Sequence, residues 1–144
     1  MELDKLIQER RSYRSLEKIS ITGDDIDKLA EAARLTLSCY NNQPWRYVFV
    51  HEAKVLETMH DALAQGNEWA KRASLIVAVV SKSDLDCQVK GREYYLFDTG
   101  MATGIMILKA TDMGLVAHPI AGFDEQKTKE ILSIPDDYTV ITLI

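Results

Sequence analysis

Hydrophobic residues recur along this chain with helical spacing in some stretches and as short apolar runs in others. The longest helical pattern runs from Glu93 to Met113 and is apolar over most of its circumference. Leu96, Ile107 and Ala110 lie off its main stripe, so we expect more than one face to be covered and the helix to be the spine of the core. Gly114 is placed to end it in a left-handed cap. The stripe that we expect to be buried consists of Tyr94, Phe97, Met101, Ile105 and Leu108.

Two glycines, Gly100 and Gly104, lie inside this predicted helix. Each costs about 1 kcal/mol relative to alanine in a helix interior, so a compensating gain is expected. Close approach of another backbone would supply it. That backbone is either the sheet of the same chain or a helix of a second subunit, and spacing does not decide between them.

The remaining patterns predict shorter helices that alternate with about four strands. Thr22 and Asp25 resemble a capping box at the start of one helix. Helices alternating with apolar strands predict a three-layer helix–sheet–helix domain, with the sheet parallel or mixed. The segment from Leu115 to Asp124 is a poor regular strand but a good backbone platform, because it contains Pro119 and Gly122. The expected helices are Met1–Glu9, Thr22–Ser38, Glu52–Gln65 and Asp124–Leu132, and the expected strands are Trp45–His51, Leu75–Val80 and Tyr138–Ile144.

Length and charge narrow the class of protein. A chain of 144 residues is expected to form a single domain, residues 1–144. Its net charge of −5 argues against a nucleic-acid partner. The charged first residues do not resemble a signal peptide, and the long helix is too short and too charged at its ends to span a membrane. We therefore expect a cytoplasmic protein with no membrane partner. Cys39 and Cys87 show neither CxxC nor metal-ligand spacing.

Two polar stretches are candidates for binding chemistry. Residues 10–14 place three arginines and a serine together, a set that suits phosphate, although a solvated basic turn has the same composition. Residues 38–45 form a polar loop that could aim amide and hydroxyl groups at a planar heteroaromatic ligand, with Trp45 anchoring the strand behind it. The alternative is a turn that only reverses the chain.

Taken in order, these motifs resemble the nitroreductase family of flavin enzymes. The motifs are RRSYR, SxxNxQPW, a long helix with FDTG that closes on MGL, HPIAGFD and IPDDY, from Arg10 to Ile144. The resemblance implies an α+β domain of three layers, with a central mixed sheet and a long central helix at the interface of a homodimer. It implies bound FMN and a hydride that passes from NADH or NADPH through the flavin to a nitroaromatic, quinone or similar small acceptor.

The resemblance also carries residues over to this chain. The first group would hold the phosphate and the pyrimidine edge of FMN, the second would reach the cofactor from a loop, often that of the partner subunit, and the third would lie against the flavin ring and offer backbone N–H groups. Hydride transfer is the cofactor's chemistry, so no side chain is assigned as acid, base or nucleophile, and no metal is expected. The groups are Arg10, Arg11, Ser12 and Arg14; Ser38, Cys39, Tyr40, Asn41 and Gln43; and Pro119, Ile120, Ala121 and Gly122.

The chain departs from the family pattern at several points. Cys39 stands where a small or hydroxylic residue is common, and we expect it to be a packed thiol. Ala121 stands where several members carry glutamate. The sequence ends on the last strand at Ile144, so we expect the family's C-terminal extension to be lacking. These departures motivate an alternative, a flavin-binding or degenerate homodimer without turnover. A third interpretation is an α/β domain with no cofactor. A short stretch from Gln65 to Glu93 predicts an open pocket and loose acceptor specificity.

Overall fold

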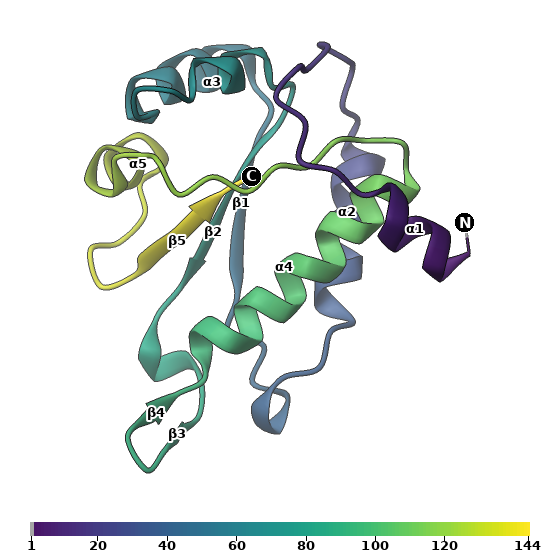
Figure 1. Ribbon diagram of the computed structural model, residues 1–144. Coiled ribbons are helices and arrows are strands. Elements are labelled where there is room, and N and C mark those ends of the chain that lie inside the picture. Colours follow the sequence, from purple (N-terminus) through teal and green to yellow (C-terminus); the bar gives the residue numbers. More distant parts are fainter. Residues whose placement is uncertain (1) are drawn as a thin grey trace.

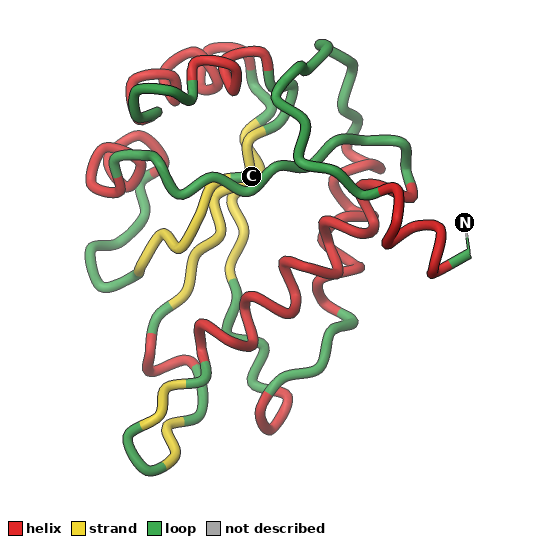
Figure 2. Tube along the Cα trace, in the orientation of Figure 1, coloured by secondary structure: helices red, strands yellow, loops and turns green. Residues whose placement is uncertain are grey.

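Three strands form the central sheet in the computed structural model, which describes residues 2–144 (Figures 1 and 2). The order is β1 (Arg46–Val50), β2 (Ile76–Ser81) and β5 (Thr139–Leu143), and both neighbouring pairs are antiparallel. We expected a mixed sheet, but the three strands are antiparallel throughout. Val50 pairs with Ile76 and Ser81 pairs with Thr139, so each connection leaves and re-enters the sheet at the same end, which requires antiparallel pairing.

Helices cover both faces of this sheet, which confirms the three layers (Figure 1). Alternate residues of β2 point to opposite faces, as the two-residue period of a strand requires. Ile76, Ala78 and Val80 belong to the core shared with α3 (Ala53–Met59) and α5 (Glu125–Leu132). Val77 belongs to the core on the other face, where Trp45 packs with residues of α2 (Gly23–Arg34) and α4 (Tyr95–Asp112). Trp45 thus anchors β1 as predicted.

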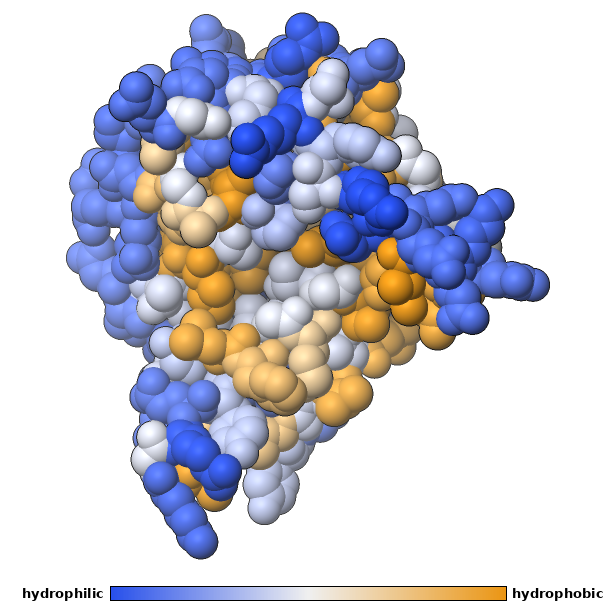
Figure 3. Space-filling model, in the orientation of Figure 1, coloured by the Kyte–Doolittle hydropathy of each residue, from blue (hydrophilic) through white to orange (hydrophobic). Residues whose placement is uncertain are grey.

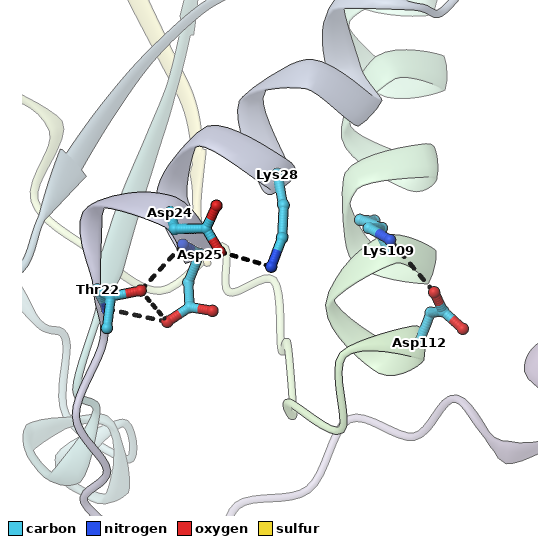
Figure 4. A network of polar contacts seen from close by, with 6 residues as sticks. All are labelled: Thr22, Asp24, Asp25, Lys28, Lys109 and Asp112. Atoms are coloured by element: carbon cyan, nitrogen blue, oxygen red, sulfur yellow. Dashed lines mark hydrogen bonds and ion pairs between the residues drawn. The ribbon is translucent and has the colours of Figure 1, made fainter.

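The helix boundaries follow local signals in the sequence. The capping box at α2 is confirmed: the Asp25 N–H donates to Thr22 Oγ1 at 3.2 Å, and the Thr22 N–H donates to Asp25 Oδ2 at 2.9 Å (Figure 4). Lys28 pairs with Asp24 one turn apart, and Lys109 pairs with Asp112 in the last turn of α4. The first helix, α1, spans Leu3–Glu9, and Met1, where the prediction began, lies outside the described residues. No helix among residues 2–144 has the length and apolar character needed to cross a bilayer.

Three segments differ from the predicted elements. The helix expected to reach Ser38 ends at Arg34. The helix expected to reach Gln65 ends at Met59 and a 3-10 turn, His60–Ala62, because the next residues pair with the 122–124 segment. The Ala64 N–H donates to the Gly122 carbonyl, and Leu63 forms a bridge with Phe123. A small hairpin precedes α4 and was not predicted. Its strands are β3 (Gln88–Val89) and β4 (Arg92–Glu93), joined through Lys90 and Gly91, both at positive φ.

The buried face of α4 is not the aromatic stripe that the spacing suggested. Phe97 and Ile105 are 62% and 45% exposed, and hydrophobic residues gather over α4 on the face shown in Figure 3. Small and polar residues, with Met106, let α4 lie close to the sheet and to α2, so the bulky residues point outward. Tyr47 of β1 contacts this buried face through a 3.1 Å hydrogen bond with Thr103. Burial raises the pKa of Tyr47 to about 12. The buried residues of α4 are Asp98, Thr99, Ala102, Thr103, Met106 and Ala110.

Gly100 and Gly104 lie on the exposed side of α4. A Cβ atom added at either glycine would meet no atom of this chain within 4 Å. The sheet of the same chain therefore does not cross α4 there. Of the two explanations for these glycines, the first is wrong, and the approach of a second chain stays a prediction.

Candidate functional site

The basic segment, residues 10–14, carries positive charge that no acidic group of the described chain neutralises. The ion pairs of residues 2–144 include none of Arg10, Arg11 and Arg14. The Arg11 guanidinium donates to the backbone carbonyls of Gln8 and Arg10, and Arg10 Nη1 lies 3.4 Å from Ser12 Oγ. These guanidinium groups are available to an anion.

Hydrogen bonds hold the segment after these arginines against a distant part of the chain. A ring nitrogen of His118 lies 3.2 Å from the Tyr13 carbonyl oxygen, and the His118 ring packs on Trp69 with centroids 4.4 Å apart. Arg72 Nε donates to the Leu16 carbonyl at 2.9 Å, and the Ile19 N–H donates to Ser74 Oγ at 2.8 Å. The basic segment is thus tied next to the residue that precedes Pro119.

Residues Pro119 to Gly122, called the platform below, lie outside any regular strand, as the sequence predicted. Ile120 exchanges two backbone hydrogen bonds with Leu143, at 2.8 and 3.3 Å, which fixes the platform to the sheet. The N–H groups of Ala121 and Gly122 have no acceptor among residues 2–144. Two unpaired donors in succession can receive an acceptor atom of a ligand.

Asn67 supports this platform, and sequence analysis did not identify it. Its Nδ2 donates to the Gly122 carbonyl at 2.8 Å, and a Cβ atom at residue 122 would lie 2.6 Å from that nitrogen. Only glycine allows this close approach at residue 122. In the sequence, Gly66-Asn67 is only a helix breaker, and no local pattern marks the contact across 55 residues.

A cavity of about 420 Å³ lies between the N-terminal segment, the start of β2 and the C-terminal half of α4. Leu16, Trp69, Met106 and His118 are among its mostly apolar lining residues. The lining includes Glu17 but no lysine or arginine. A phosphate group would therefore be bound outside the cavity, by the basic segment.

A small set of hydrogen bonds holds the loop from Ser38 to Gln43 near the start of α4. The Cys39 N–H donates to Asp98 Oδ2 at 2.6 Å, and the Gln43 N–H donates to Ser38 Oγ at 2.9 Å. Tyr40, Asn41 and Gln43 all have positive φ, a conformation that costs non-glycine residues about 1 kcal/mol or more each. Tyr40 is 92% exposed. Strained backbone of this kind indicates a loop kept for function more than for stability.

Cys39 is not the packed thiol that we expected, because it forms a disulfide with Cys87. The two residues are 48 positions apart, so no short spacing motif could have linked them. Cys87 lies between the turn at Ser83–Leu85 and the β3–β4 hairpin. The bond joins the Ser38–Gln43 loop to the segment that leads into α4.

One chain does not bring all the predicted site residues together. The loop is tied to Asp98 near the start of α4, whereas the basic segment and the platform lie together on the side of its C-terminal half (Figure 1). An α-helix of 18 residues is about 27 Å long. The predicted cofactor residues therefore form two separate groups within a chain.

Asp98 should make the stability of the fold depend on pH. Its side chain is 2% exposed, and burial raises the pKa of its carboxyl group above the ordinary 3.8, with the nearby Asp86 carboxylate adding to the rise and the Cys39 N–H opposing it. The folded chain then holds this proton more tightly than the unfolded chain. The resulting stabilisation is complete below the unfolded pKa and is lost as pH rises through the folded pKa.

We expect Asp98→Asn to remove this dependence, because an amide oxygen can still accept from Cys39 and does not titrate. Urea unfolding at several pH values between about 4 and 8 should show the variant gaining stability relative to the parent as pH rises. A difference in unfolding free energy that stays constant with pH would contradict the assignment.

Comparison with known proteins agrees with this architecture. The sequence profile of the Nitroreductase family matches residues 7–86 and 65–144. A crystal structure of a nitroreductase family protein from Clostridium novyi NT superposes with a TM-score of 0.91 at 30% identity, covering 99% of this chain and 82% of that one. A structure described as an oxidoreductase containing FMN gives a TM-score of 0.86 at 27% identity, with 99% and 75% covered. An Archaeoglobus fulgidus protein, named as a candidate NADH dehydrogenase/NAD(P)H nitroreductase, is 27% identical over 148 residues, which cover 97% of this chain and 81% of that protein.

Proposed function

Because this chain belongs to the nitroreductase family of oxidoreductases, we propose that it binds FMN and passes a hydride from NADH or NADPH through it to a small acceptor. The acceptor class is a nitroaromatic, a quinone or a similar compound. The relatives support this proposal, since one is named for NAD(P)H nitroreductase activity and a similar structure is described as containing FMN.

The observation that carries the proposal is that arginines without acidic partners lie next to backbone N–H groups without acceptors. The basic segment offers Arg10 and Arg14 without acidic partners, and the platform beside it offers the N–H groups of Ala121 and Gly122. A flavin mononucleotide needs both, a cationic site for its phosphate and donors for its ring. The residues present therefore fit the cofactor.

Each part of the chain has a distinct task in this proposal. When bound, FMN supplies the hydride chemistry by accepting and donating two electrons. The guanidinium groups hold the phosphate and stabilise negative charge at the pyrimidine edge. The platform fixes the position of the ring through its backbone, and Asn67 and Leu143 keep the platform in place.

A homodimer would complete the site. The exposed face of α4 combines Phe97 and Ile105 with Gly100 and Gly104, which leave room for a second backbone. A two-fold axis across this face would place the Ser38–Gln43 loop of one chain against the platform of the other. Burial of these apolar side chains would also stabilise the pair.

A spectrum of the protein tests this function. The protein is purified with added FMN, desalted, and its visible absorption is recorded before and after anaerobic addition of NADH or NADPH. Retained flavin bands that bleach with the nucleotide, and return with a quinone or nitro acceptor, are the expected result. Flavin that is retained but not reduced would favour the binding-only alternative, and absence of flavin would contradict the proposal.

Arg14→Ala should weaken FMN binding by roughly tenfold to a hundredfold, because a hydrogen bond between charged groups contributes about 1.5–3 kcal/mol. The measurement is FMN affinity from quenching of flavin fluorescence. Arg34→Ala is the matched control, since Arg34 is an exposed arginine of α2 paired with Glu31, outside the basic segment. Equal losses in the two variants would mean that the basic segment is only a solvated turn.

A further inference from the structure

A second candidate site includes Cys39 of the Ser38–Gln43 loop and is separate from the proposed flavin residues of the platform. Cys39, Asp86 and Cys87 each bring one potential metal ligand, two sulfur atoms and a carboxylate oxygen, and these atoms lie within 4.8 Å of one another. No other group of three or more such residues with this proximity occurs among residues 2–144. The two sulfur atoms are joined in the disulfide, so no ion can bind between them in this form.

The buried carboxylate of Asp86 is an independent indication of a ligand at this site. The residue is 9% exposed, and its Oδ2 is buried without a hydrogen-bond partner. Its other oxygen, Oδ1, accepts from the Cys87 N–H at 2.8 Å and from Asn42 Nδ2 at 3.2 Å. One oxygen thus fixes the orientation of the carboxylate and the other is left free, an arrangement common to carboxylates that bind metal.

The surroundings also lack a cation. Asp98 is buried next to Asp86, and neither carboxylate has an ion-pair partner in the described chain. A buried Asp86 carboxylate without a counter-charge is costly, and a bound divalent cation would offset that cost.

We propose that reduction of the Cys39–Cys87 disulfide creates a site for one zinc ion, bound by the two thiolates and the Asp86 carboxylate. A small dithiol supplies the two electrons: its thiolate attacks one sulfur, the Cys39–Cys87 bond breaks, and the dithiol closes its own disulfide as two cysteine thiols form. Zinc then replaces the two thiol protons, which pass to solvent. Two sulfur ligands and one carboxylate suit Zn²⁺, with water in the fourth position of the tetrahedron.

The consequence is a loop that stays tied under both redox conditions. When oxidised, the disulfide joins the loop to the segment before α4, and when reduced, zinc joins the same two residues. The proposal does not depend on flavin, so it stands or falls separately from the proposed oxidoreductase activity.

Cobalt binding to the flavin-free protein tests the site. The protein is reduced with a dithiol, desalted anaerobically and titrated with Co²⁺, followed by competition with Zn²⁺. We expect one cobalt ion per chain, a thiolate-to-cobalt charge-transfer band, the visible bands of a tetrahedral ion, and loss of all of these on adding zinc. The protein kept oxidised should show none of them, a comparison that requires no substitution and hence no change in folding.

Substitutions identify the ligands. Cys87→Ser should remove most of the charge-transfer band, and Asp86→Asn should weaken zinc binding by at least about tenfold. Asp84→Asn is the control, because Asp84 is an exposed carboxylate on the same turn and should leave the affinity unchanged. Absence of cobalt binding by the reduced parent, or equal binding by the oxidised form, would overturn the proposal. An undiminished charge-transfer band in Cys87→Ser would also overturn it.

Discussion

Under the proposed homodimer, Gly104→Glu is expected to prevent dimer formation and to lower the affinity of the protein for FMN by tenfold or more. Within one chain there is open space at this position, and glutamate is a better helix former than glycine by about 0.5 kcal/mol or more. The isolated chain should therefore remain folded. At an interface between two helices, the same side chain would occupy the space of the partner and bury a charge, which costs several kcal/mol. Sedimentation velocity gives the oligomeric state, and fluorescence titration gives the FMN affinity.

Gly23→Glu is the matched control for that experiment. Gly23 also has no neighbouring atom within 4 Å of an added Cβ, but it lies in the first turn of α2, away from the exposed face of α4. This variant should keep both the dimer and its affinity for FMN. A Gly104→Glu protein that remains dimeric would rule out α4 as the interface. A monomer that binds FMN as tightly as the parent would show that the cofactor site is complete within one chain.

Leu143→Ala should destabilise the fold by about 2–5 kcal/mol, the range for truncating a buried leucine. The side chain is 1% exposed and lies in the core between the sheet, α3 and α5. The backbone of Leu143 also holds Ile120, so the loss of packing should loosen the platform. Urea unfolding measures the free energy, and hydrogen exchange at Ile120 should accelerate more than exchange in α2.

Leu35→Ala makes the same chemical change on the surface. Leu35 is 69% exposed, and its truncation should change stability by no more than about 0.5 kcal/mol. Similar losses of stability in the two variants would mean that the burial of Leu143 contributes little to the stability of the fold. Normal exchange at Ile120 in Leu143→Ala would show that the platform is held by other contacts, such as the Asn67 hydrogen bond.

Most of the secondary structure could be predicted because it depends on neighbouring residues. The capping box at Thr22 and Asp25, the apolar β2 strand and the Asp124 cap of α5 are interactions within four residues or simple burial patterns. The ordered motifs also identified the family over nearly the whole chain, and the family profile confirms it. The platform from Pro119 to Gly122 followed from two residues with unusual backbone preferences.

What the sequence could not decide depends on contacts between distant residues. Spacing predicted α4 as a helix that is apolar over most of its circumference, but it did not identify the buried side. That side depended on which face could approach the sheet, and the small residues Ala102 and Thr103 lie on the face that does. Asn67 reaches Gly122 across 55 residues, and Cys39 reaches Cys87 across 48, so no local pattern marks either pair.

The sequence by itself determined the family and most of the elements, and it predicted the residues that would bind an anion, because these depend on residue type and short-range order. Only the tertiary structure decided that the basic segment and the platform lie together while the Ser38–Gln43 loop lies at the other end of α4. It also decided that Gly100 and Gly104 face outward and that the sulfur atoms of two cysteines lie close to a buried aspartate carboxylate. The physical reason is the same in each case: the packing of α4 against the sheet fixes which distant groups meet, and that packing is a property of the whole chain.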